Sequence, residues 1–271
     1  MTRKPSTSKP RSNISTGLTD ESRSQGSFEG LLELAKAEDY SAYLDENVHV
    51  LGSCQVCSTE RRARTREEIE SSLIIEPTSG KLLFWAENQI LHWRFAEASF
   101  MRYKKPELFK AAVRSVFLQA ITAWGDSAPI RFKEEQDAYD FEIHLMPIDD
   151  IQVGSYTAAR SFFPDSGQHR LRLYPAFFEK VPDDKERVDT LIHELGHIFG
   201  LRHFMASENG PVFSGAVYGT SNPLTIMNYG ALSELTQQDK SDLSSLYREV
   251  WSGRLTNVNR TPVELVRPWH G

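Results

Sequence analysis

The feature that most limits what this chain can fold into is an eleven-residue run at residues 193–203, HELGHIFGLRH. On an α-helix, His193 and His197 lie at positions i and i+4, so both imidazoles project from one face. Gly200 follows, and glycine can adopt the left-handed conformation that ends a helix and turns the chain back. This turn lets His203 reach the point toward which both imidazoles project. The run therefore predicts a helix and turn that present three histidine nitrogens to one metal ion.

Three nitrogen ligands are the donor set of a catalytic zinc ion, because they leave one of the four tetrahedral positions open for water. The ion makes this water acidic enough to act as a nucleophile near neutral pH. Glu194 neighbours the histidines on the helix without being a ligand, and it can take the proton of the water as general base. The run thus predicts a site for metal-assisted hydrolysis.

An ordinary buried helix would explain part of the same run. Its apolar side chains form a stripe that would pack against a core, with the histidines incidental: Leu191, Ile192, Leu195, Ile198 and Phe199. We expect these apolar side chains to pack against the core as well. Five specified residues at fixed spacing, however, arise by chance on the order of once in ten thousand chains of this length. The metal site is therefore the stronger interpretation.

Length and composition are typical of a globular enzyme. The chain has 271 residues, 39% of them hydrophobic and 11% aromatic, which suits one catalytic domain with an extension. A formal net charge of −6 argues against nucleic acid as a partner. No apolar run is long enough to cross a bilayer, so no membrane partner is expected. We expect a peptide or protein substrate and a monomeric chain.

The chain is expected to divide into four segments. Residues 1–27 are rich in Ser and Thr with an excess of basic residues, and they predict a disordered tail. No apolar segment of a secretory signal is visible there, so the expected location is cytoplasmic, with unconventional secretion as the alternative. An extension with a hypothetical regulatory role follows at 28–80, then a catalytic domain at 81–252 and a C-terminal tail at 253–271.

Hydrophobic periodicity predicts an ordered series of elements. Alternation of apolar and polar residues indicates strands, and apolar residues three or four apart indicate helices. The expected strands span residues 90–95, 130–132, 141–145, 158–163 and 170–174, and the expected helices span 106–124, 187–199 and 238–250. Pro106 suits the first turn of its helix. Upstream, we expect a helix over 28–44 and a short strand over 48–51.

In this order of elements the chain resembles the catalytic domain of the metzincin metallopeptidases, over about residues 82–250. Residues 193–203 match every fixed position of the extended metzincin motif. Metzincins also carry a methionine turn beneath the zinc, and TIMNY at 225–229 is the candidate, with Met227 as the floor of the site. The resemblance implies an α+β, zincin-like domain: a twisted, mostly parallel five-stranded sheet with an antiparallel edge strand, a zinc helix and a C-terminal helix.

Within the metzincins, several segments look like those of matrixins. Residues 124–132 resemble the end of the first helix and the start of the second strand, 159–164 the edge strand, and 235–247 the entry to the last helix of matrixins and serralysins. Matrixins bind a structural zinc through a histidine where this chain has Arg160, so we expect one catalytic zinc ion and no structural one. Tyr229 follows the astacin and serralysin pattern instead. This pattern implies that the Tyr229 side chain lies near the zinc or the oxyanion. An aromatic ring packed below the site is an equally good interpretation.

Other candidate ligands have weaker signals. Calcium binds to acidic loops in some members of this clan, and the candidates are Asp149, Asp150 and Asp165, although solvated turns are the simpler interpretation. Cys54 and Cys57 are the only thiols, and without a second ligand pair they are interpreted as ordinary thiols. As an alternative, one of them fills the open zinc position as a thiolate, as in matrixin proenzymes, but the surrounding Pro-Arg-Cys-Gly pattern is absent.

Together these patterns predict a zinc-dependent metalloendopeptidase. An extended peptide would pair by β-augmentation with the edge strand, whose residues are Ala158, Ala159, Arg160 and Ser161. Glu194 would act as the general base, and Tyr229 would assist at the oxyanion. A zinc-containing peptide-binding module that no longer turns its ligand over is the alternative from another class. The presence of Glu194 argues against that alternative.

Overall fold

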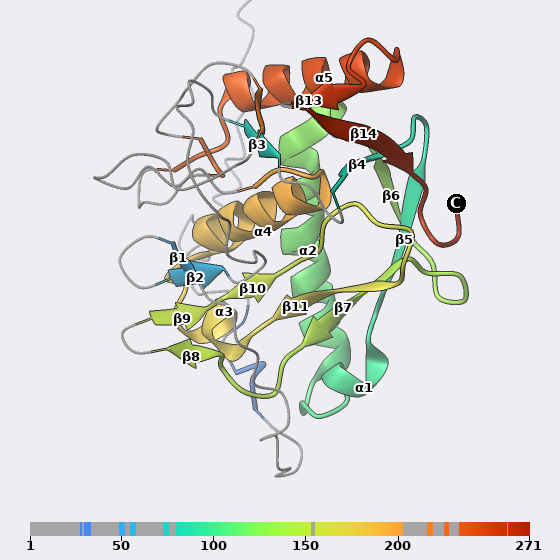
Figure 1. Ribbon diagram of the computed structural model, residues 1–271. Helices are drawn as coiled ribbons and strands as arrows, with labels where there is room; N and C mark the ends of the chain where they lie inside the picture. Colours follow the sequence, from blue (N-terminus) through green and yellow to red (C-terminus); the bar gives the residue numbers. More distant parts are fainter. Residues whose placement is uncertain are drawn as a thin grey trace, which may run out of the picture.

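The computed structural model describes most of the predicted catalytic domain and short stretches before it. The described residues are 28, 30–33, 49–51, 55–57, 73–75, 80–152, 155–202, 216–218, 225–227, 233–258 and 260–271. They form a mixed α+β fold (Figure 1). Within these ranges no helix is both long and apolar enough to span a membrane.

A five-stranded sheet forms the centre of the domain, in the order β10-β11-β7-β5-β6. Its strands, in chain order, are β5 (Ile90–Phe95), β6 (Arg131–Glu134), β7 (Phe141–Leu145), β10 (Ala159–Arg160) and β11 (His169–Leu173). The strands from β11 to β6 run parallel, whereas β10 pairs antiparallel with β11 at the edge. The predicted mostly parallel sheet with an antiparallel edge strand is confirmed.

The alternation along the strands explains which face of the sheet is buried. In β7, Phe141, Ile143 and Leu145 are buried, while Glu142 and His144 are half-buried on the opposite face. Strand β5 alternates in the same way. One apolar face per strand requires a covering layer on that face only, and helices supply it here.

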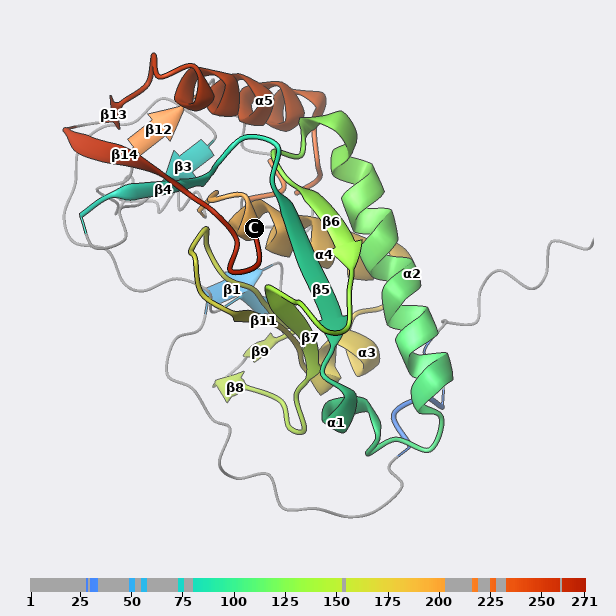
Figure 2. The same ribbon diagram turned by 90° about the vertical axis from the view of Figure 1, so that its right-hand side faces the viewer.

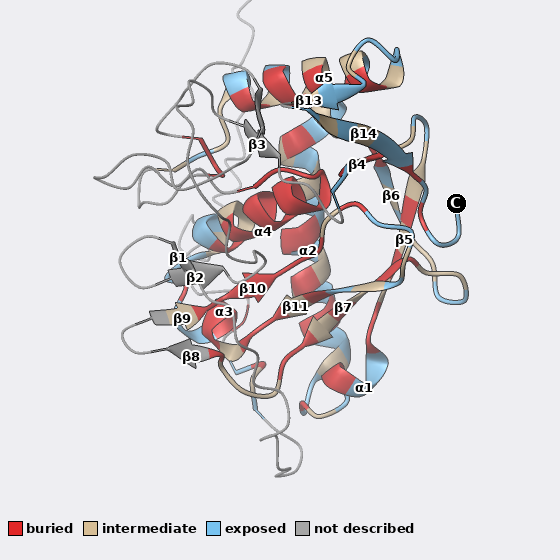
Figure 3. Cartoon of the chain, viewed as in Figure 1, coloured by how far each residue is buried: buried red, intermediate tan, exposed pale blue. Residues whose placement is uncertain are grey.

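Three long helices provide this layer. α2 (Pro106–Trp124) and α4 (Asp184–Ile198) pack against each other on one face of the sheet, and α5 (Gln237–Trp251) lies across one end (Figures 1 and 2). All three helices lie where the periodicity predicted them, within three residues at each end. Figure 3 shows α4 buried along most of its length. Short helices occupy the connections: α1 (Glu97–Phe100), η3 (Gly125–Ser127) and α3 (Pro175–Glu179).

The segment set apart as a C-terminal tail, 253–271, forms part of the domain. Its strand β14 (Thr261–Val266) pairs in parallel with β4 (Leu82–Trp85) and antiparallel with β13 (Asn257–Val258). The backbone N–H of His270 donates to the Asp140 carboxylate at 2.7 Å. We did not expect β4, β13 or β14, because each pairs only with residues distant in sequence or with the next short strand.

Residues from the predicted extension also pair with the domain. Two small sheets result: one has the order β1-β2-β9-β8, and the other pairs β12 with β3. Their strands are β1 (His49–Leu51), β2 (Gln55–Cys57), β3 (Leu73–Ile75), β8 (Ile151–Gln152), β9 (Ser155–Thr157) and β12 (Ala216–Tyr218). Of these only the strand near 48–51 was expected.

Phe28 anchors the start of the extension in the domain core. Its side chain is 4% exposed, and its ring centroid lies 6.0 Å from that of Phe109 and 5.0 Å from that of Phe178. The Lys104 backbone N–H donates to the Glu33 carbonyl at 2.9 Å. The described start of the 28–80 extension therefore packs against residues 81–252.

The helix expected over 28–44 is not formed at its described residues. The Leu31 N–H donates to the Phe28 carbonyl at 3.1 Å and closes a turn there. Residues 34–44 lie outside the described ranges. The burial of Phe28 and Leu31 explains the local pattern, because their spacing suits a turn that points both side chains into the core.

We expect Phe28→Ala to lower the free energy of unfolding by about 3 kcal/mol, because the truncation leaves a cavity among phenylalanine rings. Leu108→Ala is the control: Leu108 is 62% exposed, so its loss should change stability by less than about 0.5 kcal/mol. Chemical denaturation measures both. Equal effects of the two substitutions would show that the extension is not anchored through Phe28.

Candidate metal centre

The helix that carries the motif histidines has clear signals at both ends. Asp183 caps the first turn, where its side chain accepts the Glu186 backbone N–H at 2.8 Å. At the other end Gly200 has a φ of +91°, which residues other than glycine rarely adopt. The Gly200 N–H donates to the His197 carbonyl at 2.8 Å. The helix therefore stops and the chain turns immediately after the second histidine.

His193 and His197 meet at one point. Both side chains are buried, with 3% and 0% exposure, and their Nε2 atoms lie 3.1 Å apart with the ring planes at 87°. The i, i+4 spacing causes this convergence, because it places the residues one turn apart on one face of α4. Two nitrogens bound to one tetrahedral zinc ion would lie about 3.3 Å apart. The observed separation fits a shared metal ion.

Backbone carbonyls determine which nitrogen of each ring carries hydrogen. His193 Nδ1 lies 2.8 Å from the Ile226 carbonyl oxygen, and His197 Nδ1 lies 2.8 Å from that of Leu201. A carbonyl only accepts, so each Nδ1 is the donor and each neutral ring presents a lone pair at Nε2. Two lone pairs facing each other at 3.1 Å repel unless a cation lies between them. This donor set therefore fits a metal ion.

Glu194 lies beside this point. Its side chain is 1% exposed, and it follows His193 directly on the buried part of α4. The Ser161 hydroxyl donates to the backbone carbonyl of Glu194 at 2.9 Å. This bond ties the helix to the segment that follows β10. A buried carboxylate one residue from His193 on the same helix is suited to exchange a proton with a molecule held near the imidazoles.

Met227 packs against the turn of α4 between the two histidines. It is fully buried, and a Cβ atom built on Gly196 would lie 2.3 Å from the Met227 Sδ. That distance is far inside normal contact. With a larger residue at position 196, the Met227 side chain would therefore have to shift. That Met227 forms the floor of a zinc site remains a prediction, and its packing against α4 agrees with it.

We expect Gly196→Ala to lower the free energy of unfolding by about 1–2 kcal/mol, because the cost of overpacking exceeds the gain in helix propensity. In a Met227→Ala background the same substitution should be neutral or stabilising, since the clash is removed. A double-mutant cycle by chemical denaturation measures this coupling. Additive effects would mean that Met227 does not limit the size of the side chain at position 196.

Aromatic side chains from three other elements hold α4 in place. The Trp124 indole N–H donates to the Ile192 carbonyl at 3.0 Å. The Trp85 indole N–H donates to the Ile198 carbonyl at 2.7 Å, and the Tyr247 hydroxyl donates to the next carbonyl at 3.0 Å. Burial raises the pKa of Tyr247, so the hydroxyl stays protonated as a donor. The bonds to the Ile198 and Phe199 carbonyls satisfy groups at the helix end that have no partner within the helix.

Two predicted site residues, His203 and Tyr229, lie outside the described ranges. Among the residues that the structure describes, no group of three or more His, Cys, Asp or Glu side chains gathers as a metal site would require. Two of the three predicted ligands are thus brought together, and the described backbone reaches Arg202, one residue before the third. Cys54 also lies outside, and Cys57 is described only as part of β2.

The edge strand is shorter than the predicted 158–163. Strand β10 comprises only Ala159–Arg160, because the Ser161 side chain already turns to α4. The Ala158 carbonyl, just before β10, accepts the Tyr174 N–H at 3.0 Å. Of the predicted edge residues, Ala158 and Ala159 are buried at 1% exposure each. The segment 158–161 therefore lies between the sheet and α4.

Arg160 forms a buried ion pair where a matrixin would place a structural-zinc histidine. Its guanidinium lies 2.9 Å from the Asp150 carboxylate. The other calcium candidates also have structural partners. Asp149 accepts the Ala176 N–H at 2.6 Å and pairs with Lys180 at 2.9 Å. Asp165 accepts the N–H of residue 167 at 2.8 Å. The interpretation of these acids as solvated turn residues is wrong for Asp150, whose carboxylate is buried in the ion pair with Arg160.

Sequence reasoning missed the residues that surround the histidines. The Phe163 ring contacts His197 with centroids 5.4 Å apart, and the Arg202 guanidinium lies 3.4 Å from the Phe163 centroid. The carbonyls of Ile226 and Leu201, which orient the rings, have no residue-type signal. Arg202 alone could have been noticed, as a buried charge directly before a motif histidine.

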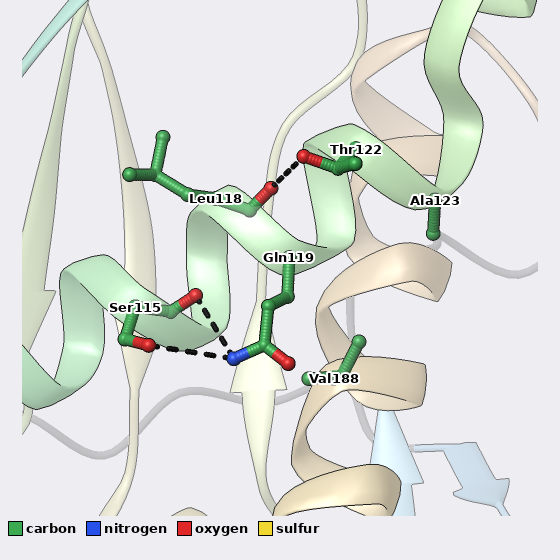
Figure 4. A pocket seen from close by; sticks show the side chains of 6 residues that line it. All are labelled: Ser115, Leu118, Gln119, Thr122, Ala123 and Val188. Carbon is green, nitrogen blue, oxygen red and sulfur yellow. Dashed lines mark hydrogen bonds between the residues drawn. The ribbon is translucent and has the colours of Figure 1, made fainter. Parts of the chain in front are cut away.

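A surface pocket between α2 and α4 is not a second candidate site. It is lined by Ser115, Leu118, Gln119, Thr122, Ala123 and Val188 (Figure 4). The Thr122 hydroxyl donates to the Leu118 carbonyl at 2.8 Å, and the Gln119 amide donates to the Ser115 carbonyl at 3.3 Å. These polar groups bond within their own helix, so none is directed at a ligand.

Comparisons with known proteins agree with the resemblance of the motif. No protein-family model matches the chain. Serralysin G of Dickeya chrysanthemi is similar to it, with 28% identity over 149 residues that cover 46% of this chain and 30% of serralysin G. The chain thus spans less than a third of the length of that relative. Serralysins are among the metzincins that the sequence resembles, and the mixed, mostly parallel fold is compatible with them.

Two solved structures of myroilysin are also similar to the chain. One has a TM-score of 0.43 and 15% identity, and the aligned region covers 65% of this chain and 98% of the myroilysin chain. The other has a TM-score of 0.46 and 16% identity, with 80% and 99% covered.

Proposed function

We propose that the chain is a zinc-dependent metalloendopeptidase. The observation that supports this most is the pair of buried imidazoles, whose Nε2 lone pairs face each other at 3.1 Å beside Glu194. Such a donor arrangement has no use in an ordinary core, because two acceptors that face each other without a cation are destabilising. The similarity of the chain to a serralysin supports a peptide or protein substrate.

His193 and His197 would hold the zinc ion, with His203 as the third ligand. When bound, zinc acidifies a water molecule and polarises the scissile carbonyl. The carbonyls of Ile226 and Leu201 keep both rings in the tautomer that can bind a cation. A hydrogen bond from the second ring nitrogen to an acceptor orients a histidine ligand and raises its basicity.

Glu194 is the general base in this proposal. Its carboxylate accepts a proton from the attacking water and later gives it to the leaving amine. Its position is held by the helix, whose carbonyl at the same residue accepts the Ser161 hydroxyl. Tyr229 is proposed to donate to the oxyanion. The substrate would pair in extended form with the edge-strand segment 158–161, which supplies register without a required sequence.

The test is digestion of a denatured protein by the purified chain. We expect cleavage, its loss after treatment with a chelator, and recovery when zinc is added back. Mass spectrometry of the products distinguishes internal cleavage from trimming. Activity that persists without metal would contradict the proposal. Tight binding of peptides by the zinc-loaded chain without any cleavage would favour the binding module instead.

A further inference from the structure

The face of the central sheet opposite α2 and α4 carries a cluster of charged side chains. The strand register pairs Arg94 with Glu142 and Glu142 with Arg170, and two residues further along it pairs His144 with Arg172. Paired residues of neighbouring strands point to the same face. All five are half-buried or exposed, and the residues between them are buried. Figure 2 shows α4 behind β5 and β7. These five residues are named the arginine face below.

The carboxylate of the arginine face already has a partner. One oxygen of Glu142 accepts two N–H groups of Arg94, at 3.1 and 2.8 Å. Arg94 also donates to the Gln136 carbonyl at 2.9 Å, and its guanidinium covers the Tyr139 ring. The Arg170 Nε lies 4.0 Å from the other oxygen of Glu142, which is too long for a hydrogen bond. Arg94 and Glu142 therefore bind each other, whereas Arg170 is held only loosely.

Arg172 has no acidic partner among the residues that the structure describes. Its neighbour on β10 is another arginine, Arg160, whose charge is balanced by Asp150 at 2.9 Å. The side chain of Arg170, two residues earlier on β11, is 52% exposed, and Arg172 is half-buried. Both guanidinium groups are thus accessible to a ligand that approaches from solvent.

The imidazole of His144 responds to this excess of positive charge. Its pKa is lowered to about 4, first by burial and then by the charges of Arg170, Arg102 and Arg172, which outweigh that of Glu142. The chain as a whole has a net charge of −6, so the excess is local. Exposed charges are screened beyond about 8 Å at physiological ionic strength. A ligand close to this face therefore responds to the arginines more than to the net charge.

The spacing of the two accessible arginines fits an extended peptide. Arg170 and Arg172 are two residues apart on one strand, so their Cα atoms lie about 6.6 Å apart and their side chains share a face. Alternate residues of any extended peptide have nearly the same spacing. Carboxylates at positions i and i+2 can therefore meet both guanidinium groups, each of which can bind a carboxylate through two parallel hydrogen bonds. Acids at adjacent positions would point to opposite sides of such a peptide.

We propose that the arginine face binds an acidic segment of a polypeptide, with Arg170 and Arg172 taking two carboxylates at alternate positions. This binding does not require the metal centre. Its consequence for catalysis rests on the proposed peptidase function: protein substrates with such a segment away from the scissile bond would be retained. Binding of a remote segment is equal in the ground state and the transition state, so it lowers KM and leaves kcat unchanged.

Fluorescence anisotropy with two labelled peptides of equal composition tests the binding. One alternates glutamate and serine, and the other repeats the unit Glu-Glu-Ser-Ser, in which no two glutamates are two positions apart. The zinc-loaded Glu194→Gln protein is used so that neither peptide is cleaved. We expect the alternating peptide to bind about fivefold more tightly, and 1 M NaCl to abolish its binding. Equal affinities for the two peptides, or no binding of either, would overturn the inference.

Substitution of both arginines locates the binding. Arg170→Gln combined with Arg172→Gln should weaken binding of the alternating peptide by about tenfold, whereas the two lysine substitutions should retain most of the affinity. Arg248→Gln with Arg254→Gln is the matched control, because it removes the same charge from exposed residues on α5 and just after it. Equal weakening in both glutamine variants would mean that net charge causes the binding, and the inference would be wrong. The wild-type comparison of peptides decides if the first variant does not fold.

A single-stranded oligonucleotide of equal charge tests the other class of acidic polymer. Proteins that bind single strands stack bases on aromatic rings, and the Tyr139 ring at this face is covered by Arg94. We therefore expect the oligonucleotide to bind more weakly than the alternating peptide. If it binds more tightly and loses this affinity in the Arg170 and Arg172 glutamine variant, the ligand is a nucleic acid and the inference is wrong.

Kinetics with tailed substrates tests the consequence for cleavage. A cleavable peptide identified by digestion receives either the alternating acidic tail or a neutral tail through a flexible linker. We expect the acidic tail to lower KM about fivefold without changing kcat, and this advantage to vanish in the Arg170 and Arg172 glutamine variant but not in the control. An equal KM for both tails would refute the retention of substrates. If the zinc-loaded wild type cleaves neither, the proposed function fails, while the anisotropy result still decides whether the arginine face binds acidic peptides.

Discussion

Glu194→Gln is expected to lower kcat/KM for peptide cleavage by about 10²- to 10⁴-fold. The substitution keeps the shape of the side chain but removes its ability to accept a proton. Since Glu194 is 1% exposed inside α4, a side chain of the same size should leave the helix and both histidines in place. Zinc content and thermal unfolding should therefore remain close to those of the wild type. Steady-state kinetics with a single peptide measures the effect.

The control for this prediction is Glu186→Gln on the same helix. Glu186 is an exposed residue in the first turn of α4, and losing its charge should change kcat/KM by less than about twofold. Full activity of Glu194→Gln would refute the role of Glu194 as general base. An equal loss in both variants would indicate that the charge of α4 matters rather than the position of one carboxylate.

His197→Ala is expected to weaken zinc binding by more than about 100-fold and to abolish peptide cleavage. The side chain is fully buried and supplies one of the two converging nitrogens. Because an ion that binds only the folded state stabilises it, zinc should raise the melting temperature of the wild type. It should have little effect on the variant. Metal analysis after gel filtration and thermal scans with and without zinc measure both effects.

His270→Ala serves as the control for the loss of a histidine. Its side chain is exposed, and its backbone N–H donates to Asp140. This variant should retain zinc, its stabilisation and its activity. If His197→Ala still bound one zinc ion per chain with wild-type affinity, the proposed ligand set would be wrong. The two variants together separate a specific ligand from general metal binding by histidine.

Elements with a local signal could be predicted from the sequence. Strand β7 shows strict alternation at 141–145, and α2 begins at Pro106, where a missing N–H costs nothing. The mostly parallel five-stranded sheet with an antiparallel edge strand was implied by the resemblance to metzincins. The short strands β4, β13 and β14 could not be predicted, because pairing between distant backbones leaves no periodic pattern in either segment.

The features of the candidate site also differ in whether the local sequence encodes them. The convergence of His193 and His197 is encoded locally, because helical spacing alone places them on one face. The partners of their Nδ1 atoms are backbone carbonyls, and backbone groups are the same at every residue. The contact of Met227 with Gly196 depends on a chain segment far along the sequence. No pattern in either segment predicts this contact, since a lone glycine in a helix is otherwise only unfavourable.

The pairing of β4 with β14 has a consequence for the order in which the domain can form during synthesis. Strand β4 emerges from the ribosome early, whereas its neighbour β14 emerges after all three long helices. Trp85 sits on β4 and donates to the last turn of α4. Contacts between such distant segments form slowly, because a long loop must close first. The nascent chain therefore completes the support of α4 only after translation has passed residue 266.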